Sequence, residues 1–150
     1  MSLLAIDVGA GTQDILLYDQ EVPLEGSTKM ILPSQTVLVG NRINQARMMG
    51  RDVFLCGPTM GGGSSTAAVR WHLAAGLGVS ATPTAAATIN DDLEKAAALG
   101  VVICDEAPSQ ALKVETGDID IAALKKAFGL FDRDLPPDIA VAVQDHGFSP

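Results

Sequence analysis

The segment Leu4–Asp19 reads LAIDVGAGTQDILLYD, two apolar runs joined by the turn Gly9–Gly11. Two such runs separated by three or four residues that include glycine predict a β-hairpin. Glycines permit a tight turn with positive φ, and consecutive uncovered N–H groups form a concave site for an anion. Asp7, at the end of the first strand, can hold a hydrated Mg²⁺ opposite that anion. The segment therefore predicts either a phosphate site or a plain hairpin turn.

Two other phosphate-binding motifs are excluded by the residues that follow this turn. A dinucleotide-binding GxGxxG would need a third glycine and would open a helix, whereas position 14 is Asp and the chain continues as a strand. No GxxxxGK[ST] occurs in the chain. A strand, a glycine turn and a second strand, with Asp7 just before the turn, is a different kind of site.

The rest of the chain alternates short apolar runs with helical patterns. We expect helices over residues 36–49, 64–75, 84–99 and 120–131, and further strands over residues 29–32, 53–56, 79–82, 101–104, 113–115 and 139–143. Apolar strands that alternate with helices favour a mostly parallel sheet covered on both faces. The sequence thus predicts an α/β fold: one domain over residues 1–150, a mixed sheet with an N-terminal antiparallel hairpin, and helices on both faces. The first strand should lie beside the parallel strand 139–143.

The composition indicates a soluble protein with a packed core. Of the 150 residues, 47% are apolar and 19% are charged, and the net charge is −8. This acidity argues against nucleic acid or an anionic membrane surface as a partner. The start lacks the basic region of a signal peptide, and the longest uncharged stretch, residues 71–90, contains Pro83. We therefore expect a cytoplasmic location.

The remaining sulfur and imidazole side chains are interpreted as structural. Cys56 and Cys104 each end an apolar run, so we expect two buried thiols in a reducing compartment. The chain has no closely spaced cysteine triplet, and we expect no iron–sulfur cluster. Met48 and Met49 are interpreted as helix core, and His72 as a packing residue rather than a ligand.

Two further segments are candidate sites. Gly61, Gly62 and Gly63 precede a predicted helix whose N-terminal amides would attract an anion, and the alternative is a flexible loop with a serine cap. Asp145 and His146 follow the last predicted strand, where ligands bind in open α/β sheets. There His146 can act as a general base, and Asp145 can fix its tautomer or bind a metal. The alternative for this pair is a polar strand exit.

The pattern Ile6-Asp7-x-Gly9-x-Gly11-Thr12-x-Asp14 resembles the first phosphate loop of the superfamily that unites actin, the large heat-shock chaperones, acetate kinase and the sugar kinases. Its members have two ribonuclease-H-like lobes with ATP and Mg²⁺ bound between them. The resemblance implies a ribonuclease-H-like fold, with Mg²⁺ and water positioned by Asp7. It also implies that the turn touches the β- and γ-phosphates through Gly9, Ala10, Gly11, Thr12 and Gln13.

Segments spread over nearly the whole chain are similar to a family of archaea and anaerobic bacteria labelled "putative pyruvate formate-lyase activating enzyme". The segments are GPTMGGG at 57–63, DDLE at 91–94 and AVAVQDHGFSP at 140–150. A radical activase of that kind needs three closely spaced cysteines for its cluster, whereas this chain has two, 48 positions apart. We therefore do not expect iron–sulfur radical chemistry.

The function expected from these features is that of a nucleotide-binding lobe of an ATPase or a sugar-kinase-like phosphotransferase. The alternative is a non-catalytic nucleotide-sensing or assembly module with a relic phosphate loop. No second Asp-Gly hairpin lies between Asp19 and Pro150, so we expect the N-terminal half of a two-lobed protein that acts on a small-molecule substrate. Without the C-terminal lobe, ATP binding should be weak, and an exposed apolar face should favour self-association.

Overall fold

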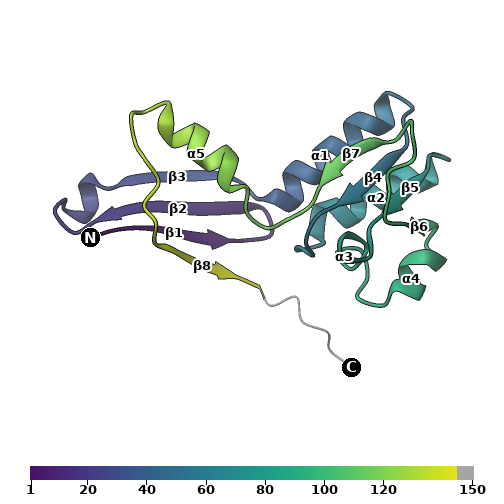
Figure 1. Ribbon diagram of the computed structural model, residues 1–150, viewed down its shortest axis with the longest axis horizontal. Coiled ribbons are helices and arrows are strands. Elements are labelled where there is room, and N and C mark those ends of the chain that lie inside the picture. The colour runs from purple at the N-terminus through teal and green to yellow at the C-terminus, as the bar shows by residue number, and fades with distance from the viewer. Residues whose placement is uncertain (145–150) are drawn as a thin grey trace. The chain divides into compact units, whose positions relative to one another are not determined.

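The computed structural model describes residues 1–144, which form two compact units, each with its own sheet and core. Unit 1 consists of Met1–Ser34 and Ile119–Gln144, and unit 2 of Gln35–Asp118 (Figure 1). No helix within residues 1–144 is long and apolar enough to cross a membrane.

Unit 1 is built on a four-stranded mixed sheet. Strands β1 (Ser2–Val8), β2 (Thr12–Asp19) and β3 (Thr28–Pro33) form an antiparallel meander, with the short 3-10 helix η1 (Leu24–Gly26) before β3. Strand β8 (Ile139–Val143) pairs with β1 in parallel, so the order is β3-β2-β1-β8. The predicted hairpin and the predicted neighbour of its first strand are both confirmed.

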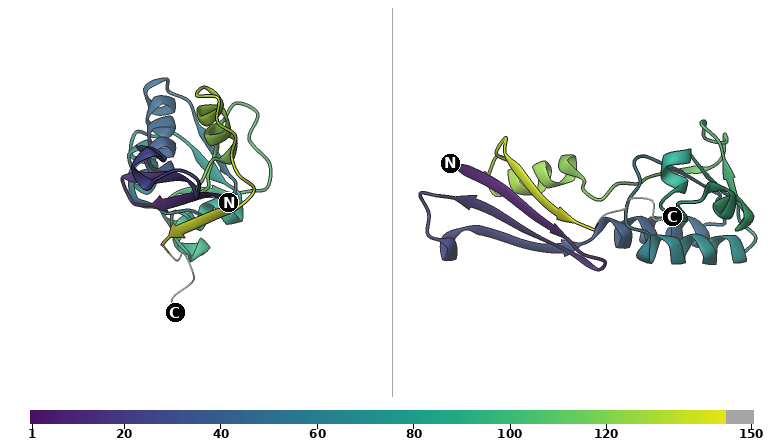
Figure 2. Two further views of the ribbon diagram at one scale, coloured as in Figure 1. Left: turned by 90° about the vertical axis from the view of Figure 1, so that its left-hand side faces the viewer. Right: turned by 90° about the horizontal axis from the view of Figure 1, so that it is seen from below.

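The core of unit 1 lies between this sheet and helix α5 (Ile121–Gly129). Alternate strand residues point to opposite faces of a sheet. Leu4, Ile6 and Ile15 pack against Leu124 and Phe128 of the helix, which Figure 2 shows on one side of the strands. The first turn of α5 is capped by the Asp120 side chain, which accepts a 2.8 Å hydrogen bond from the Ala123 N–H.

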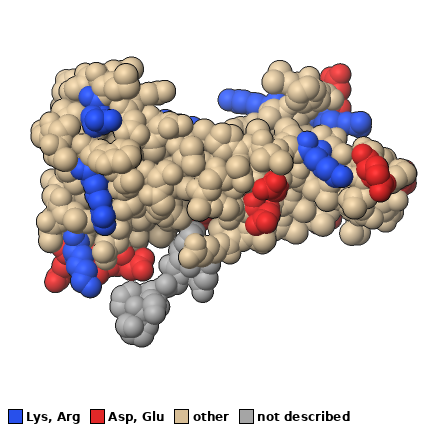
Figure 3. Space-filling view, turned by 180° about the vertical axis from the view of Figure 1, so that it is seen from behind, with Lys and Arg blue, Asp and Glu red and all other residues tan. Residues whose placement is uncertain are grey.

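The opposite face of this sheet is open among the described residues of unit 1. It carries Ala5, Leu16 and Ile31, and the Ile31 side chain is 71% exposed. Helices on both faces were predicted, but no α-helix of unit 1 covers this face within residues 1–144. Figure 3, which views the molecule from behind, shows the charged side chains in scattered groups separated by stretches of uncharged surface.

Unit 2 is a parallel α/β sheet. Its strands are β4 (Val53–Cys56), β5 (Val79–Ala81), β6 (Val101–Ile103) and β7 (Leu112–Glu115), in the order β6-β5-β4-β7. Its helices are α1 (Gln35–Met48), α2 (Gly63–Ala74), α3 (Pro83–Ala86) and α4 (Leu93–Ala98). A single core cluster joins Leu55 and Val114 of the sheet to Ile43 of α1 and Val69 of α2.

The α/β class is confirmed, but the strands divide between two sheets where one was expected. A right-handed crossover through a helix brings each parallel strand beside the one before it. Strands β4, β5 and β6 therefore assemble among themselves through α2, α3 and α4. The chain returns to β1 only after α5, through β8.

The prediction of a single helix over residues 84–99 is wrong, because the helical conformation is interrupted between α3 and α4. The Asp92 carboxylate accepts hydrogen bonds from the N–H groups of Glu94 at 3.0 Å and Lys95 at 3.4 Å. Such an N-cap starts a new helix. The Thr82 side chain caps α3 in the same way, by accepting from the Ala85 N–H.

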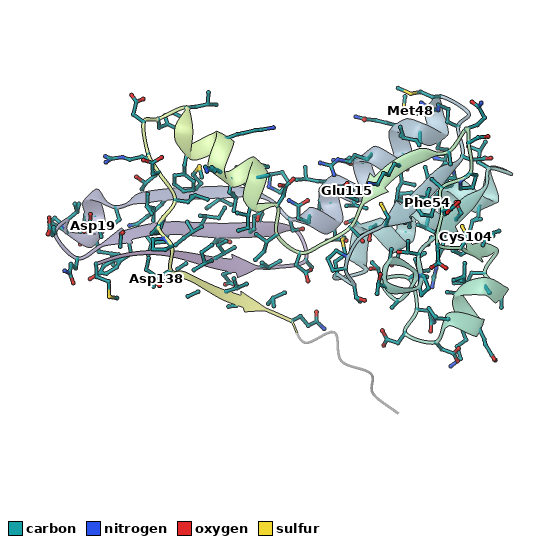
Figure 4. The ribbon with its side chains drawn as sticks, in the orientation of Figure 1. Asp19, Met48, Phe54, Cys104, Glu115 and Asp138 are labelled. Atoms are coloured by element: carbon teal, nitrogen blue, oxygen red, sulfur yellow. The ribbon has the colours of Figure 1, made fainter. Side chains whose placement is uncertain are left out.

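Two packing expectations are also wrong. Met48 and Met49 are 84% and 69% exposed, because the buried face of α1 ends at Ala46; Figure 4 shows Met48 at the far end of that helix. Cys56 and Cys104 are partly exposed rather than buried, and both thiols are free. Each lies at or just beyond the carboxyl end of its strand, where the core no longer encloses it.

Candidate functional site

The turn between β1 and β2 is held by bonds that leave its central N–H groups uncommitted. The Gly9 N–H donates to the Thr12 carbonyl at 2.8 Å and closes a tight turn. Ser34 holds the outside of the turn: its hydroxyl donates to the Ala10 carbonyl and its N–H to the Gly11 carbonyl, both at 3.1 Å. Within residues 1–144, the N–H groups of Ala10 and Gly11 have no acceptor. The exposed turn therefore presents two backbone donors to the solvent.

Positive φ is not the reason for glycine in this turn. Neither Gly9 nor Gly11 lies in the left-handed region. A Cβ built on Gly11 would meet no atom of the described chain within 4 Å, and one on Gly9 would lie 3.1 Å from the Thr12 carbonyl oxygen. Internal packing therefore does not demand glycine at position 11. A side chain there would instead reduce access to the neighbouring amides.

Two carboxylates lie opposite each other beside the turn. The register of β1 and β2 pairs Asp7 with Asp14, and both are exposed on the open face of the sheet. The Thr12 hydroxyl is 3.5 Å from Asp14 Oδ2, at the outer limit of a hydrogen bond. Like charges directly opposite each other in an antiparallel pair are unfavourable. A divalent cation bound by both carboxylates would relieve this repulsion.

The sequence pattern includes Asp14 but gives it no role, although its pairing with Asp7 follows from the position of the hairpin turn. A tight turn centred between Ala10 and Gly11 pairs each residue before it with the residue equally far beyond it, and so pairs Asp7 with Asp14.

Gln13 is separated from the carboxylates by the alternation of the strand. Its side chain is 2% exposed and lies on the α5 face, opposite to Asp7 and Asp14. The Gln13 Nε2 donates to the Pro33 carbonyl at 2.9 Å, while Oε1 is buried with no partner among the described atoms. Gln13 therefore belongs to the interior of unit 1 rather than to the exposed turn.

A groove runs along the open face beside the carboxylate pair. Its volume is about 610 Å³, and all of its lining belongs to unit 1. Asp7 and Asp14 are part of that lining, with Leu16, Ile31 and Ala142 among its apolar members. The site thus combines uncommitted amides, paired carboxylates and an apolar wall.

In the second predicted anion site the amides of Gly61 and Ser65 are used internally, whereas those of Gly62, Gly63 and Ser64 have no acceptor within residues 1–144. The Gly61 N–H donates to Asp118 Oδ1 at 3.0 Å, and the Ser65 N–H donates to Thr36 Oγ1 at 3.1 Å. The first turn of α2 is therefore capped by Thr36 of α1 and not by a serine of the loop, as the alternative interpretation had it. A protein carboxylate already occupies the place on Gly61 that an anion would take.

Two of the three glycines of this loop have structural causes. A Cβ on Gly62 would come 2.6 Å from Thr66 Oγ1 and 2.9 Å from the Thr88 carbonyl oxygen, and Gly63 has a φ of +35°. Close backbone packing and an unusual φ both favour glycine.

Strands β1 and β8 have their carboxyl ends at the same edge of the sheet, as predicted, because the two strands are parallel and Asp7 is in register with Ala142. Asp145 and His146 lie outside the described residues, so their catalytic roles stay predictions. Within residues 1–144 no group of three or more His, Cys, Asp or Glu side chains could hold a metal. A cation at Asp7 and Asp14 would need further ligands from water or a bound anion.

His72, on α2, is a packing residue. It is fully buried, and neither ring nitrogen has a hydrogen-bond partner within the described part of the chain. Burial lowers the pKa of His72 below its ordinary value, which favours the neutral ring. Burial likewise raises the pKa of the Cys56 thiol, so that thiol is a weaker nucleophile than an exposed one at neutral pH.

Residues 60–150 match the family described as "Putative pyruvate format-lyase activating enzyme (DUF1786)". The chain belongs to this family. The match begins at Met60, just before the Gly61–Gly63 loop, and runs through the rest of unit 2, α5 and β8, while the Gly9–Gly11 turn precedes it. No curated protein and no solved structure matches the chain.

The family description does not by itself assign an iron–sulfur cluster to this chain. Such clusters are held by several cysteine thiolates. The region that matches the family contains one cysteine, Cys104, and Cys56 precedes it.

Proposed function

We propose that unit 1 binds a Mg²⁺-nucleotide through the Gly9–Gly11 turn, as the phosphate-binding lobe of an ATPase or phosphotransferase with two lobes. The observation that carries the proposal is the pair of exposed, uncommitted N–H groups of Ala10 and Gly11 beside the Asp7–Asp14 pair. Adjacent backbone N–H groups bind phosphate oxygens without needing a basic side chain.

The carboxylates explain why the ligand would be a metal–phosphate complex rather than a free phosphate. Two carboxylates repel an anion, and the net charge of −8 adds to that repulsion. Mg²⁺ is bound through one or two carboxylates together with substrate phosphates and water. Asp7 and Asp14 fit that ligand set, and the Thr12 hydroxyl can add a hydrogen bond on the same face.

In this proposal the chain contributes positioning and charge, which are the main protein contributions to phosphoryl transfer. The N–H groups of Ala10 and Gly11 hold the phosphate oxygens in place. Asp7, at the end of β1, orients the hydrated metal against them. The glycine at position 11 leaves the approach to these amides open. The acceptor would be a small molecule held with the help of the second lobe.

Titration calorimetry of the full chain with Mg²⁺-ADP and Mg²⁺-ATP tests this proposal. Weak binding is expected, with Asp7→Asn lowering the affinity at least tenfold, about 1.4 kcal/mol. Asp91→Asn, which removes an exposed carboxylate in unit 2, is the matched charge control and should leave the affinity unchanged. Binding that survives both Asp7→Asn and Asp14→Asn, or no binding up to millimolar nucleotide, would contradict the proposal.

An assay of phosphate release from Mg²⁺-ATP separates the enzyme from the nucleotide-sensing module. Phosphate release that disappears in Asp7→Ala supports an ATPase or phosphotransferase. Nucleotide binding without phosphate release supports a module that senses nucleotide.

A further inference from the structure

Among the described residues 1–144, strand β8 forms one edge of the unit 1 sheet. It pairs with β1 on one side, and within residues 1–144 no strand pairs with its other side. All five of its residues are exposed and none is charged. The other edge strand, β3, carries Lys29 and ends at Pro33, features that block the addition of another strand.

The register shows which backbone groups of β8 are available. The Leu4 N–H donates to the Asp138 carbonyl at 3.0 Å, and Leu4 is in register with Ile139. In a parallel ladder successive residues point their backbone groups to alternate sides. Ala140 and Ala142 therefore direct theirs toward β1. The N–H and C=O groups of Ile139, Val141 and Val143 point away from the sheet.

The sequence of β8 is nearly symmetric about its centre. It reads Ile-Ala-Val-Ala-Val, with Val141 in the middle. A two-fold axis at Val141 would place Ile139 opposite the partner subunit's Val143, and Val141 opposite the partner subunit's Val141. All three outward-pointing residues then form hydrogen-bonded pairs. Directly opposite residues share a face of the sheet, so branched side chains would meet branched side chains.

The ends of the strand are compatible with the same register. Asp138, which precedes β8 (Figure 4), would lie opposite the partner subunit's Gln144. A carboxylate then faces an amide, which can donate a hydrogen bond to it. No like charges meet within the paired segment of residues 138–144.

We propose that β8 binds a second copy of this chain by antiparallel pairing about Val141, so that the two four-stranded sheets become one of eight strands. The interface is isologous and closes as a dimer. It further covers Ile139, Val141 and Val143, which are 40%, 43% and 45% exposed in the single chain. The net charge of −8 on each copy opposes the approach, so association strengthens as salt screens that repulsion.

Sedimentation equilibrium of the full chain tests the interface. A monomer–dimer equilibrium is expected, tighter at high than at low salt. Val141→Lys places two cations opposite each other at the axis and should weaken dimerisation at least tenfold. Met48→Lys makes a similar change at an 84% exposed side chain in unit 2 and should leave the dimer unchanged. A protein that stays monomeric at all concentrations, or dimerises equally as Val141→Lys, overturns the proposal.

Cysteine crosslinking in a Cys56→Ser, Cys104→Ser background tests the register without a charge change. Hydrogen-bonded antiparallel partners have Cα atoms about 5.5 Å apart, within disulfide range. Val141→Cys alone should therefore crosslink on oxidation. Val143→Cys alone should not, since its own symmetry mate would lie roughly 13 Å along the strand. The Ile139→Cys, Val143→Cys double variant should crosslink again. Equal crosslinking of the two single variants contradicts this register.

Discussion

The two glycine-rich segments, Gly9–Gly11 and Gly61–Gly63, look alike in sequence and differ in what holds them. The first amide of each is bonded, that of Gly9 to the Thr12 carbonyl within the turn and that of Gly61 to the distant carboxylate of Asp118, and the next two amides of each have no acceptor among the described residues. The first segment joins two antiparallel strands, and the second leads into α2. Glycine content alone therefore does not show how such a segment is held in the fold.

The reasons for glycine also differ between the two segments. At Gly62 a Cβ would press on the Thr88 carbonyl oxygen, and Gly63 has positive φ, so internal structure accounts for both. At Gly11 neither crowding nor φ requires glycine. A glycine that internal structure does not require is the better candidate for contact with a ligand.

The largest expected difference is in stability. Gly62→Ala should lower the free energy of unfolding by about 2–3 kcal/mol, because its Cβ would lie 2.9 Å from a backbone carbonyl oxygen. Gly11→Ala should change it by less than about 1 kcal/mol. Urea denaturation of both variants measures the contrast. Equal losses would show that the Gly9–Gly11 turn is as constrained as the loop.

The next effect concerns the carboxylate that occupies the loop. Asp118→Ala should destabilise unit 2 by about 1–2 kcal/mol, since the Gly61 N–H loses a charged acceptor. Asp91→Ala is the control for the loss of a carboxylate. If inorganic phosphate restores the stability of Asp118→Ala but does not affect the control, the Gly61–Gly63 loop can also bind an anion. The two glycine-rich segments would then be alike in this property.

Acidification should lower the stability of unit 2, where α2 carries the buried His72. Burial lowers the pKa of His72 below its unfolded value of about 6.5, so below that pH the unfolded state binds the extra proton. Stability is therefore complete above about pH 6.5 and falls as the pH decreases, by at most about 1.4 kcal/mol per pH unit from this group.

Urea denaturation as a function of pH, compared between the protein and His72→Gln, measures this contribution. The variant should show the shallower pH dependence. Hydrogen exchange at mildly acidic pH should show lost protection in α2 before β1 and β2. An unchanged pH profile in His72→Gln would contradict the assignment.

The smallest expected effect comes from the paired carboxylates. Asp14→Asn should raise the free energy of unfolding by about 0.2–1 kcal/mol at low ionic strength without divalent cations, because it removes the repulsion from Asp7. The gain should shrink in high salt. Added Mg²⁺ should stabilise the unchanged protein more than the variant. Identical responses to Mg²⁺ would argue against a cation at this pair.

Most elements of the fold could be predicted because they depend on neighbours in the chain. Alternation and the glycine turn define β1 and β2, and helical spacing defines α1 close to its observed bounds. The break between α3 and α4 was missed because alanines on both sides favour a helix, although Asn90, Asp91 and Asp92 between them are of the residue types that cap a helix N-terminus. That break depends on the capping bonds of a single carboxylate, Asp92.

The sequence by itself determined the α/β class, the hairpin and the position of Asp7 before an exposed turn, since each follows from local periodicity and turn chemistry. Only the tertiary structure decided which amides remain uncommitted. Asp118 bonds to Gly61 from 57 positions away, and Ser34 holds the Gly9–Gly11 turn from the next strand. It also decided that the strands form two sheets and that Gln13 faces inward. These outcomes depend on contacts between residues distant in sequence, which no local pattern encodes.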